Sequence, residues 1–560
     1  MITIQKRLGQ YYTKPKIVNA MLDMIGYRTD EELHTKRMLE PSTGDGAFLS
    51  FAISRLIESV KGKMDLEKLN RDEDFLENLL KDSFRAIEVN PQTYEELKIE
   101  ICEHIQSEGI NENIARKLSE HWIVNEDFLS WNLNLEERFD FIIGNPPYIR
   151  IENIDPQVLE TYRERFETLY DRADIYIAFM EHGLNMLTNK GILSYICTDR
   201  FAKNNYGKKI RAHISNSFRV KYFIDLNQTQ PFLSDVSAYP CIFGIDRKHG
   251  EASMCLYTDS IAEEEIKEII ASVISNKETK IVDSHLKEEW FKNDDPWILD
   301  IAVLPILEKL QFLYPSIKQA PLGVQCKVGV ATGLNRVFLI SNKIVEKFKL
   351  EKELLIPIIT KDHIKTGKIN WDGKYLINTF DENNQAVNIN EFPNIKSYLN
   401  LHKESLANRA FVRKNKTGLN WFYTQEKVRL KEINIPKLVF PDIASKSRII
   451  IENGKYYPEH SLYYVLPGKW NIETLRILME SPIGLAFVKA YSTKMRGGYS
   501  RFQKQSVEKI CLPTNLSCEI EAEIHEAYKK DDQSRMNLLL KKVYNLNNRE
   551  MDLLINYVTN

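Results

Sequence analysis

Four short apolar segments in the first 150 residues each run directly into a polar or glycine-containing motif. They lie at residues 38–40, 84–89, 122–124 and 139–143, with longer polar stretches between them. Short apolar segments that alternate with helices are typical of α/β folds with a mostly parallel sheet. The motifs at the ends of such strands are where these folds bind their ligands.

The same alternation continues further along the chain. We predict a helix over about 174–187, followed by strands at 192–197, 220–226 and 239–245. The last two strands are predicted to form an antiparallel edge pair. The fold class is therefore α/β, with a mostly parallel sheet in the N-terminal part of the chain.

The sequence Asn145-Pro146-Pro147-Tyr148 follows the fourth apolar segment. Two prolines fix φ and donate no hydrogen bonds, so the neighbouring carbonyls are free to accept. Asn145 adds an amide oxygen and Tyr148 adds an aromatic face. Such a loop suits a planar group that carries an amine, for example the exocyclic amine of a nucleobase. The simpler alternative is a turn at a strand end, capped by an asparagine.

The other three segments end in motifs that suit a nucleotide-like ligand. Gly44 and Gly46 allow close approach of the backbone to a ligand, and the helix that follows offers free N–H groups. Glu88, near the end of the second segment, suits a ribose diol. Asp127 and Phe128 follow the third segment and could hold an adenine amine and ring. A glycine loop alone is weak evidence, because many turns between strands and helices need glycine.

In this order, the motifs resemble those of the S-adenosylmethionine-dependent amino-methyltransferases of DNA. The resemblance is closest to the adenine-N6 enzymes of restriction-modification systems, whose cofactor motifs precede the catalytic loop and whose target recognition domain comes last. Residues 9–15, Gly-Gln-Tyr-Tyr-Thr-Lys-Pro, fit the N-terminal motif of that family. The motifs cover about residues 8–247, and residues 329–335 with Phe338 resemble recognition domains of modification enzymes.

This resemblance implies a Rossmann-like methyltransferase domain, the cofactor S-adenosyl-L-methionine, double-stranded DNA as partner, and no metal. It assigns catalysis to Asn145, Pro146 and Tyr148, which bind the target base together with Phe232. The cofactor-binding residues that it implies are Thr13, Glu40, Pro41, Ser42, Thr43, Gly44, Glu88, Asp127, Phe128 and Pro147. Simpler alternatives stay open. Glu40 and Asp45 could cap the helix after the glycine loop, Phe232 could be a core residue, and Tyr11 and Tyr12 could only pack.

The implied chemistry is a direct methyl transfer. The lone pair of adenine N6 is delocalised into the ring, so the amine is a poor nucleophile. Accepting both of its N–H bonds, at the Asn145 side chain and the Pro146 carbonyl, would favour a tetrahedral nitrogen that attacks the sulfonium methyl group in line. Because N6 is paired inside a duplex, the base must be flipped out, with Tyr148 and Phe232 replacing the lost stacking.

At 560 residues the chain is long enough for several domains. We predict a catalytic, cofactor-binding domain at 1–250, a connecting segment at 251–300, an α+β target recognition domain at 301–515 and a helical segment at 516–560. An exposed helical insertion is predicted within 61–82, where charged residues are dense.

The net charge of −2 hides two basic regions. Residues 401–450 hold 11 Lys or Arg against four Asp or Glu, and residues 485–510 hold six against one. A local excess of cations is what the neutralisation of phosphates requires. Lys414, Lys416 and Lys427 are the predicted contacts to the DNA backbone, and the region from Lys494 to Lys504 is the alternative. A solvated face with chance clustering is the simpler interpretation.

The seven cysteines are scattered and include no Cys-x-x-Cys pair, which fits a reducing compartment. With no apolar run of about 18 residues and no cleavable apolar leader, a cytoplasmic, prokaryotic protein without membrane contact is expected. A partner restriction endonuclease or defence-system subunit is possible. The chain enters its first motif within ten residues, so no N-terminal nuclease domain is expected. The alternatives are an RNA or protein-glutamine methyltransferase that uses the same loop, or a non-catalytic DNA-binding subunit.

Overall fold

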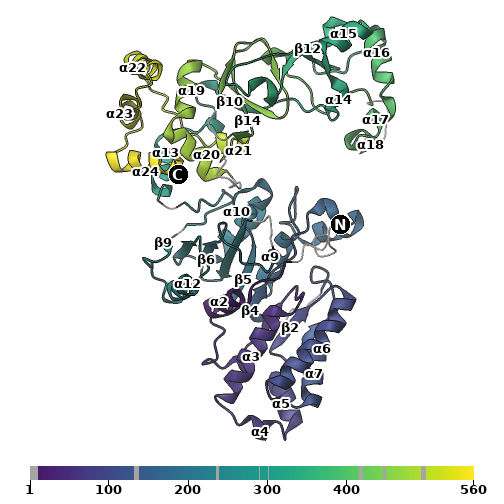
Figure 1. Cartoon of the computed structure of the whole chain (residues 1–560), viewed down its shortest axis with the longest axis vertical. Coiled ribbons are helices and arrows are strands. Elements are labelled where there is room, and N and C mark those ends of the chain that lie inside the picture. The colour runs from purple at the N-terminus through teal and green to yellow at the C-terminus, as the bar shows by residue number, and fades with distance from the viewer. Residues whose placement is uncertain are drawn as a thin grey trace. The chain divides into compact units, whose positions relative to one another are not determined.

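The computed structural model describes residues 11–131, 138–234, 239–288, 290–300, 302–414, 421–444, 449–492 and 500–559. The chain folds into two compact units, Met1–Leu299 and Asp300–Asn560, and each has a hydrophobic core of its own (Figure 1). No helix among the described residues is long and apolar enough to cross a membrane.

A nine-stranded sheet organises the first unit, in the order β3-β2-β1-β4-β5-β7-β6-β8-β9. Its strands are β1 (Met38–Glu40), β2 (Phe84–Ile87), β3 (Ile123–Val124), β4 (Phe139–Gly144), β5 (Leu187–Thr198), β6 (Arg219–Asp225), β7 (Pro240–Asp246), β8 (Ser253–Tyr257) and β9 (Asp283–Lys287). The strands β1 to β5 are parallel, whereas β7 is antiparallel to both β5 and β6. The predicted α/β fold with a mostly parallel sheet is confirmed.

The chain reverses its direction across this sheet between β1 and β4. It runs outward from β1 through β2 to β3 and then returns to β4, which pairs with the other side of β1. In open α/β sheets such a reversal leaves a crevice at the carboxyl ends of the two strands. The glycine loop follows β1 and the Asn-Pro-Pro-Tyr loop follows β4, so both border this crevice.

Eleven α-helices connect or flank these strands in the described part of the unit. They are α2 (Pro15–Ile25), α3 (Ala47–Lys61), α4 (Leu66–Leu69), α5 (Glu73–Leu80), α6 (Pro91–Ser107), α7 (Glu112–Trp122), α8 (Pro156–Arg165), α9 (Tyr176–Asn185), α10 (Arg200–Lys203), α11 (Lys208–Ser217) and α12 (Glu263–Ser275). The predicted helical insertion within 61–82 corresponds to α4 and α5.

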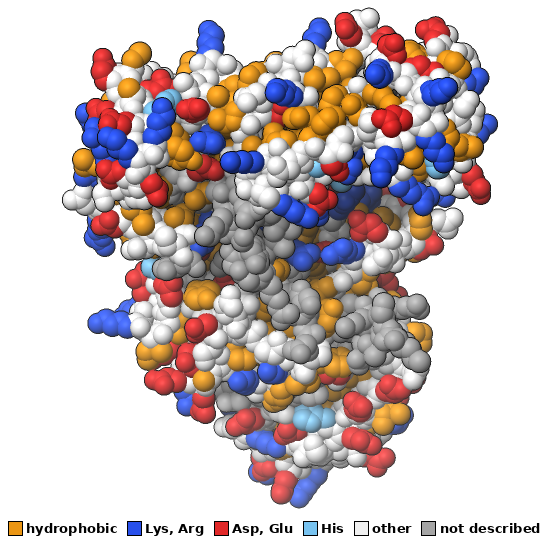
Figure 2. All heavy atoms as spheres, turned by 45° about the horizontal axis from the view of Figure 1, so that its top comes forward, with side chains coloured by type: hydrophobic (Ala, Val, Ile, Leu, Met, Phe, Trp, Pro, Cys, Tyr) orange, Lys and Arg blue, Asp and Glu red, His pale blue; other side chains and the backbone are white. Residues whose placement is uncertain are grey.

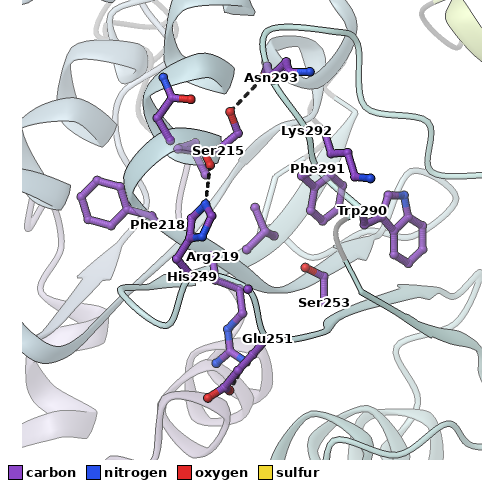
Figure 3. A pocket seen from close by; sticks show the side chains of 14 residues that line it. Ser215, Phe218, Arg219, His249, Glu251, Ser253, Trp290, Phe291, Lys292 and Asn293 are labelled. Carbon is purple, nitrogen blue, oxygen red and sulfur yellow. Dashed lines mark hydrogen bonds and ion pairs between the residues drawn. The ribbon is translucent and has the colours of Figure 1, made fainter.

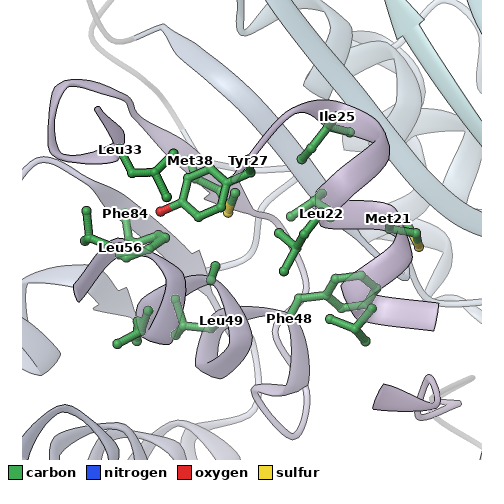
Figure 4. Packing of buried hydrophobic residues seen from close by; sticks show 14 of the residues in the cluster. Met21, Leu22, Ile25, Tyr27, Leu33, Met38, Phe48, Leu49, Leu56 and Phe84 are labelled. Carbon is green, nitrogen blue, oxygen red and sulfur yellow. The ribbon is translucent and has the colours of Figure 1, made fainter. Parts of the chain in front are cut away.

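The core that supports the glycine loop lies between α2, α3 and the strands β1 and β2 (Figure 4). The ring of Tyr27, just after α2, lies edge-on to Phe141 at a centroid distance of 5.4 Å. Gly46 starts α3 with φ +74°, and a Cβ there would lie 2.4 Å from the Leu97 side chain. The positive φ favours glycine here, whereas the Leu97 methyl group is the end of a flexible side chain that can move.

Two expectations about this unit are corrected. The segment 251–300, predicted to be a connection, contributes β8, α12 and β9 to the first unit, which ends at Leu299. Consequently the antiparallel pair β6–β7 exists but lies inside the sheet, because β8 and β9 extend beyond it. The strand β8 is buried at its first four positions, and its mostly apolar sequence, Ser-Met-Cys-Leu-Tyr, is compatible with the strand that the sequence analysis did not assign.

The second unit is α+β, as predicted. It contains the sheets β10-β18-β14-β16, β11-β13-β12-β17 and β15-β19. The strands are β10 (Gln325–Val328), β11 (Leu339–Ser341), β12 (Leu355–Ile359), β13 (Lys374–Ile377), β14 (Lys437–Pro441), β15 (Ile443–Ala444), β16 (Ile450–Glu452), β17 (Tyr457–Pro458), β18 (Leu462–Leu466) and β19 (Ser500–Arg501).

Its helices are α13 (Leu304–Leu313), α14 (Asn335–Phe338), α15 (Asn342–Phe348), α16 (Pro393–Asn400), α17 (Lys403–Ala407), α18 (Ala410–Lys414), α19 (Ile472–Glu480), α20 (Pro482–Tyr491), α21 (Lys504–Val507), α22 (Cys518–Lys529), α23 (Gln533–Val543) and α24 (Asn548–Thr559). The last three form the predicted helical segment. They belong to the second unit, since Lys489 of α20 donates to the carbonyl of Tyr557 in α24 at 2.6 Å.

Candidate active site

One cavity lies in the crevice between β1 and β4, and seven of the predicted site residues surround it. These seven are Thr13, Glu40, Ser42, Thr43, Gly44, Asn145 and Pro147, and Tyr11, Tyr12, Asp45, Ala47 and Phe48 complete the lining. The cavity is narrow, with a volume of about 30 Å³.

Glu40 is a buried carboxyl group in the lining of this cavity. It is 2% exposed, and its Oε2 has no hydrogen-bond partner within the described residues. Burial raises the pKa of this carboxyl well above its usual value, and the negative charges of Asp45 and Glu88 raise the pKa further. A backbone hydrogen bond from Leu49 lowers the pKa in part, but the buried oxygen without a partner leaves the anion incompletely solvated, so the site favours a proton or a cationic ligand.

Glu88 holds the glycine loop through hydrogen bonds to backbone N–H groups. Its Oε2 accepts from the backbone N–H of Gly44 at 3.0 Å, and its Oε1 accepts from the N–H of Asn90 at 2.8 Å. Thr43 is fixed beside it, because its backbone N–H and its hydroxyl both donate to the carbonyl of Ile87. Burial raises the pKa of Glu88. The carboxylate oxygens can accept more than one hydrogen bond each, so Glu88 keeps acceptor capacity for a ligand hydroxyl.

The predicted adenine contacts Asp127 and Phe128 do not line the cavity. Phe128 is 2% exposed and packs against Phe179 and His182, at centroid distances of 5.1 and 4.6 Å. Both oxygens of Asp127 accept hydrogen bonds, from Leu129 N–H, the Ser130 hydroxyl and the Tyr162 hydroxyl. Their assigned role stays a prediction.

Asn145 begins the loop at the end of β4, and its amide orientation follows from its contacts. Its Nδ2 donates to the backbone carbonyl of Tyr11 at 2.5 Å and to the hydroxyl of Thr13 at 3.3 Å. A carbonyl oxygen can only accept, so this contact requires the amide nitrogen on that side. The side-chain oxygen of Asn145 is left as a hydrogen-bond acceptor.

Tyr148 completes the loop as a neutral aromatic ring. Burial, followed by the neighbouring thiols of Cys197 and Cys241, raises its pKa well above the usual value, and its hydroxyl donates to the Ile196 carbonyl at 3.2 Å. A phenol that stays protonated cannot act as a base near neutral pH. The ring, rather than the hydroxyl, is therefore the part of Tyr148 available for recognition.

Phe232 lies beside Tyr148, with 6.4 Å between the ring centroids. Tyr11 contacts both rings, at 5.3 Å from Tyr148 and 6.1 Å from Phe232. Phe232 is only 1% exposed in this cluster. Sequence analysis did not assign Tyr11 to the site; its place in the N-terminal motif was the only signal for it.

A larger cavity of about 300 Å³ lies elsewhere in the first unit (Figure 3). Phe218, Trp290 and Phe291 form its aromatic walls, and an ion pair of 2.6 Å between Arg219 and Glu251 lies at its edge. It lies at the amino ends of β6 and β8. The loops after β1 and β4, in contrast, lie at the carboxyl ends of their strands. None of the predicted site residues lines it.

The basic region 401–450 contains two structural cations that composition could not separate from the others. Arg409 is buried and donates to the carbonyls of Leu406, Thr332 and Trp421. Lys437 is fully buried and pairs with Glu452 at 2.9 Å.

Of the three predicted phosphate contacts, only Lys427 has a described side chain. It is exposed, and its amine donates to the carbonyl of Asn384 at 2.6 Å. Lys414 ends α18 and its side chain is not described, whereas Lys416 lies outside the described residues. On the face that Figure 2 shows, Lys and Arg side chains are interspersed with acidic and hydrophobic ones.

Comparison with known proteins agrees with this geometry. Residues 45–232 match the family model "Eco57I restriction-modification methylase". The chain is 34% identical over 557 residues to "Type II methyltransferase M.BstVI" from Geobacillus stearothermophilus, covering 98% of this chain and 97% of that protein. It is also 34% identical to "Type II methyltransferase M.PaeR7I" from Pseudomonas aeruginosa, over 97% of this chain and 92% of the relative.

Among solved structures, the fold is similar to that of the Type IIL restriction-modification enzyme MmeI in complex with DNA, with a TM-score of 0.59 at 12% identity. The match covers 97% of this chain and 73% of the MmeI chain. At this identity the likeness concerns the fold alone. The chain is similar to the two curated relatives along almost its whole length, and it matches the family model. The loops that meet in the crevice agree with both findings. The chain therefore belongs to the Type II methyltransferases of restriction-modification systems.

Proposed function

We propose that this protein transfers a methyl group from S-adenosylmethionine to N6 of an adenine in double-stranded DNA, after the base is flipped out of the duplex. The observation that carries the proposal is the orientation of Asn145. Its amide nitrogen is engaged by Tyr11 and Thr13, which leaves an acceptor oxygen on a loop that borders the cavity. An exocyclic amine has two N–H bonds and needs acceptors of this kind.

The cavity fits the cofactor in its charge. S-adenosylmethionine, when bound, supplies a methyl group on a cationic sulfonium, and it also carries an ammonium group. Glu40 offers a buried carboxylate oxygen without a partner, which a cation of the ligand would satisfy. Glu88 retains acceptor capacity beside the glycine loop for ligand hydroxyls.

The loop residues have separate tasks in this proposal. The Asn145 oxygen and the Pro146 carbonyl accept the two N–H bonds of the target amine, which raises the electron density on its nitrogen. Tyr148, held neutral, supplies an aromatic face for the base. The nitrogen forms a bond to the methyl carbon as the carbon–sulfur bond breaks and its electron pair stays on sulfur. The methylated nitrogen then loses one proton to solvent, so no side chain has to act as a strong base before the transfer.

Base binding requires the aromatic cluster of Tyr11, Tyr148 and Phe232 to open. Rings that enclose a base on both faces need about 7 Å between their planes, twice the stacking distance of 3.4 Å. Tyr148 and Phe232 meet edge to face at 6.4 Å, which leaves no room for a base between them. When the two rings move apart, they lose their contact with each other and can stack on the base instead. This stacking offsets part of the free energy that is lost when the base leaves the duplex.

Double-stranded DNA as the substrate is supported by the relatives and by the second unit. MmeI, whose fold is similar along almost the whole chain, is in complex with DNA. The α+β unit from Asp300 onward presents exposed lysines, including Lys403, Lys427 and Lys431. We propose that this unit is the target recognition domain, and that a restriction endonuclease with the same target sequence accompanies the protein in its prokaryotic host.

The decisive experiment is to incubate the purified protein with S-adenosylmethionine and plasmid or genomic DNA, followed by modification-sensitive sequencing. The expected product is N6-methyladenine at one sequence motif. If the product is N4-methylcytosine, the target base is cytosine and not adenine. Methyl transfer only to RNA or to protein glutamine, or DNA binding without transfer, would overturn the proposal.

A first prediction concerns the pH dependence of cofactor binding. Because the pKa of Glu40 is raised, its carboxyl is protonated in the ligand-free protein at pH values above the usual 4.5. A cationic ligand binds the ionised form, so affinity should increase as the pH rises toward the raised pKa and then level off. Over the same range the ligand-free protein should lose stability, since it buries the anion at a cost.

Calorimetric titrations with S-adenosylmethionine, in two buffers of different ionisation enthalpy, measure both the affinity and the proton released. Glu40→Gln is the matched control, because glutamine has nearly the same shape and does not titrate. It should bind more weakly and show no such pH dependence. An unchanged pH profile in Glu40→Gln would assign the titration to another group.

A second prediction concerns salt. Each phosphate contact that is removed should reduce the slope of log K against log salt concentration by about 0.9 for duplex DNA. Replacing the exposed Lys403, Lys427 and Lys431 with glutamine should therefore weaken DNA binding and flatten this slope. Fluorescence anisotropy across a salt series measures it. Lys63→Gln, an exposed position in the first unit, is the control, and an equal slope in wild type and triple variant would locate the phosphate contacts elsewhere.

A further inference from the structure

The N-terminal segment 11–14 is fixed against a distant part of the first unit. Thr13 forms an antiparallel bridge with Phe232. On either side, the N–H of Lys14 donates to the Pro231 carbonyl and the N–H of Leu233 donates to the Tyr12 carbonyl, both at 2.9 Å. These backbone bonds place the Tyr11 carbonyl and the Thr13 hydroxyl where they meet Asn145.

The two contacts decide which end of the Asn145 amide faces the substrate. With Nδ2 held by the Tyr11 carbonyl and the Thr13 hydroxyl, the side-chain oxygen is the free end. A half-turn of the amide would set two oxygens against each other at the Tyr11 carbonyl. It would also present N–H donors to an amine that itself needs acceptors. The flipped amide cannot support the proposed reaction.

Thr13 also borders the cofactor cavity. It is buried, and it lines the cavity together with Glu40, Gly44 and Pro147. Its side chain is therefore adjacent to both halves of the site: the cavity on one side and the amide of Asn145 on the other. A cofactor contact alone does not require the hydroxyl to lie within hydrogen-bonding distance of the Asn145 nitrogen.

We propose that Thr13 is a positioning residue for the methyl transfer. Its hydroxyl, with the Tyr11 carbonyl, holds the Asn145 amide in the orientation in which the oxygen accepts from the target amine. This inference rests on the proposed function and adds to it a residue that acts through Asn145, besides the cofactor contact that the sequence resemblance implies for it.

The test compares Thr13→Val with Thr13→Ser in the full-length protein. Valine keeps the branched shape and removes the hydroxyl, whereas serine keeps the hydroxyl. At saturating cofactor and DNA, the single-turnover rate of Thr13→Val should fall about two- to tenfold, as expected for the loss of one hydrogen bond. Thr13→Ser should restore most of this rate. Calorimetry measures the cofactor Kd of Thr13→Val separately, so the loss of a cofactor contact does not enter the rate at saturation.

A double-mutant cycle with Asn145→Ala isolates the contact. Alanine has no amide group for Thr13 to hold, whereas an aspartate could still accept a hydrogen bond from the Thr13 hydroxyl. If Thr13 acts through this hydrogen bond, Thr13→Val should cause no further loss of rate in the Asn145→Ala background. An equal loss in both backgrounds would overturn the proposal.

The remaining outcomes are equally distinct. A wild-type rate in Thr13→Val, or a rate in Thr13→Ser as low as in Thr13→Val, would also overturn the positioning role. A weaker cofactor Kd with a normal rate at saturation would leave Thr13 as a cofactor contact only. If the wild-type protein transfers no methyl group to DNA, the proposed function fails and this inference fails with it.

Discussion

Replacing Asn145 with alanine should lower the rate of methyl transfer at least 100-fold while cofactor binding is retained. The variant loses the one acceptor oxygen that the Tyr11 and Thr13 contacts leave free at the end of β4. Loss of a single preorganised hydrogen-bonding group in other active sites costs about 100- to 1000-fold in kcat. The effect should appear in kcat rather than in the Kd of the cofactor, because the interaction strengthens in the transition state.

Single-turnover methyl transfer and calorimetric titration with S-adenosylmethionine measure the two quantities separately. Asn153→Ala is the matched control, since it removes an amide of the same kind from an exposed position after the same loop. It should behave like wild type. Near-normal turnover in Asn145→Ala would exclude the proposed mechanism, whatever the result for cofactor binding.

The strands and loops that build this site could be predicted because their signals are local. The strands β1, β2 and β4 are short apolar segments, and the motifs that follow them are continuous in sequence. The parallel order brings their carboxyl ends together without further information. For this reason the predicted Thr43, Gly44, Asn145 and Pro147 are found around one cavity.

The contacts across the site could not be predicted because they join residues far apart in the chain. Tyr11 reaches Asn145, 134 residues away, through its backbone carbonyl, which no side-chain pattern reveals. The bridge between Thr13 and Phe232 has the same character. For Phe128 the sequence motif suggested a contact with the adenine of the cofactor. The motif could not show that Phe128 packs against Phe179 and His182, because these two residues belong to the distant helix α9.

Charge counting had a similar limit in the second unit. Composition treats every lysine in 401–450 alike, although Lys437 is inside the core and Lys427 and Lys431 are exposed. The difference arises from strand pairing, because Lys437 of β14 lies opposite Glu452 of β16. A buried lysine that pairs with a buried carboxylate is part of the core, and it is not available to a phosphate.

Replacing Lys437 with methionine should destabilise the second unit by about 3–5 kcal/mol, the range for removing one partner of a buried ion pair. Lys437 and Glu452 have side-chain exposures of 0% and 1%, and the lysine amine also donates to the Ile433 carbonyl at 2.9 Å. Glu452 further accepts from the N–H groups of Gly454, Lys455 and Tyr456. Without Lys437 its charge would stay buried with these bonds alone.

Hydrogen exchange read by mass spectrometry resolves this effect by location. Peptides from β14 and β18 should lose protection in Lys437→Met, whereas peptides from β4 and β5 of the first unit should exchange as in wild type. Replacing Glu452 with leucine as well should not restore stability, since the three N–H groups would lose their acceptor. Lys431→Met, an exposed position close by, should change stability by less than about 0.5 kcal/mol. Equal protection of β14 in the wild type and Lys437→Met would contradict this prediction, because an unpaired buried carboxylate should destabilise the strand.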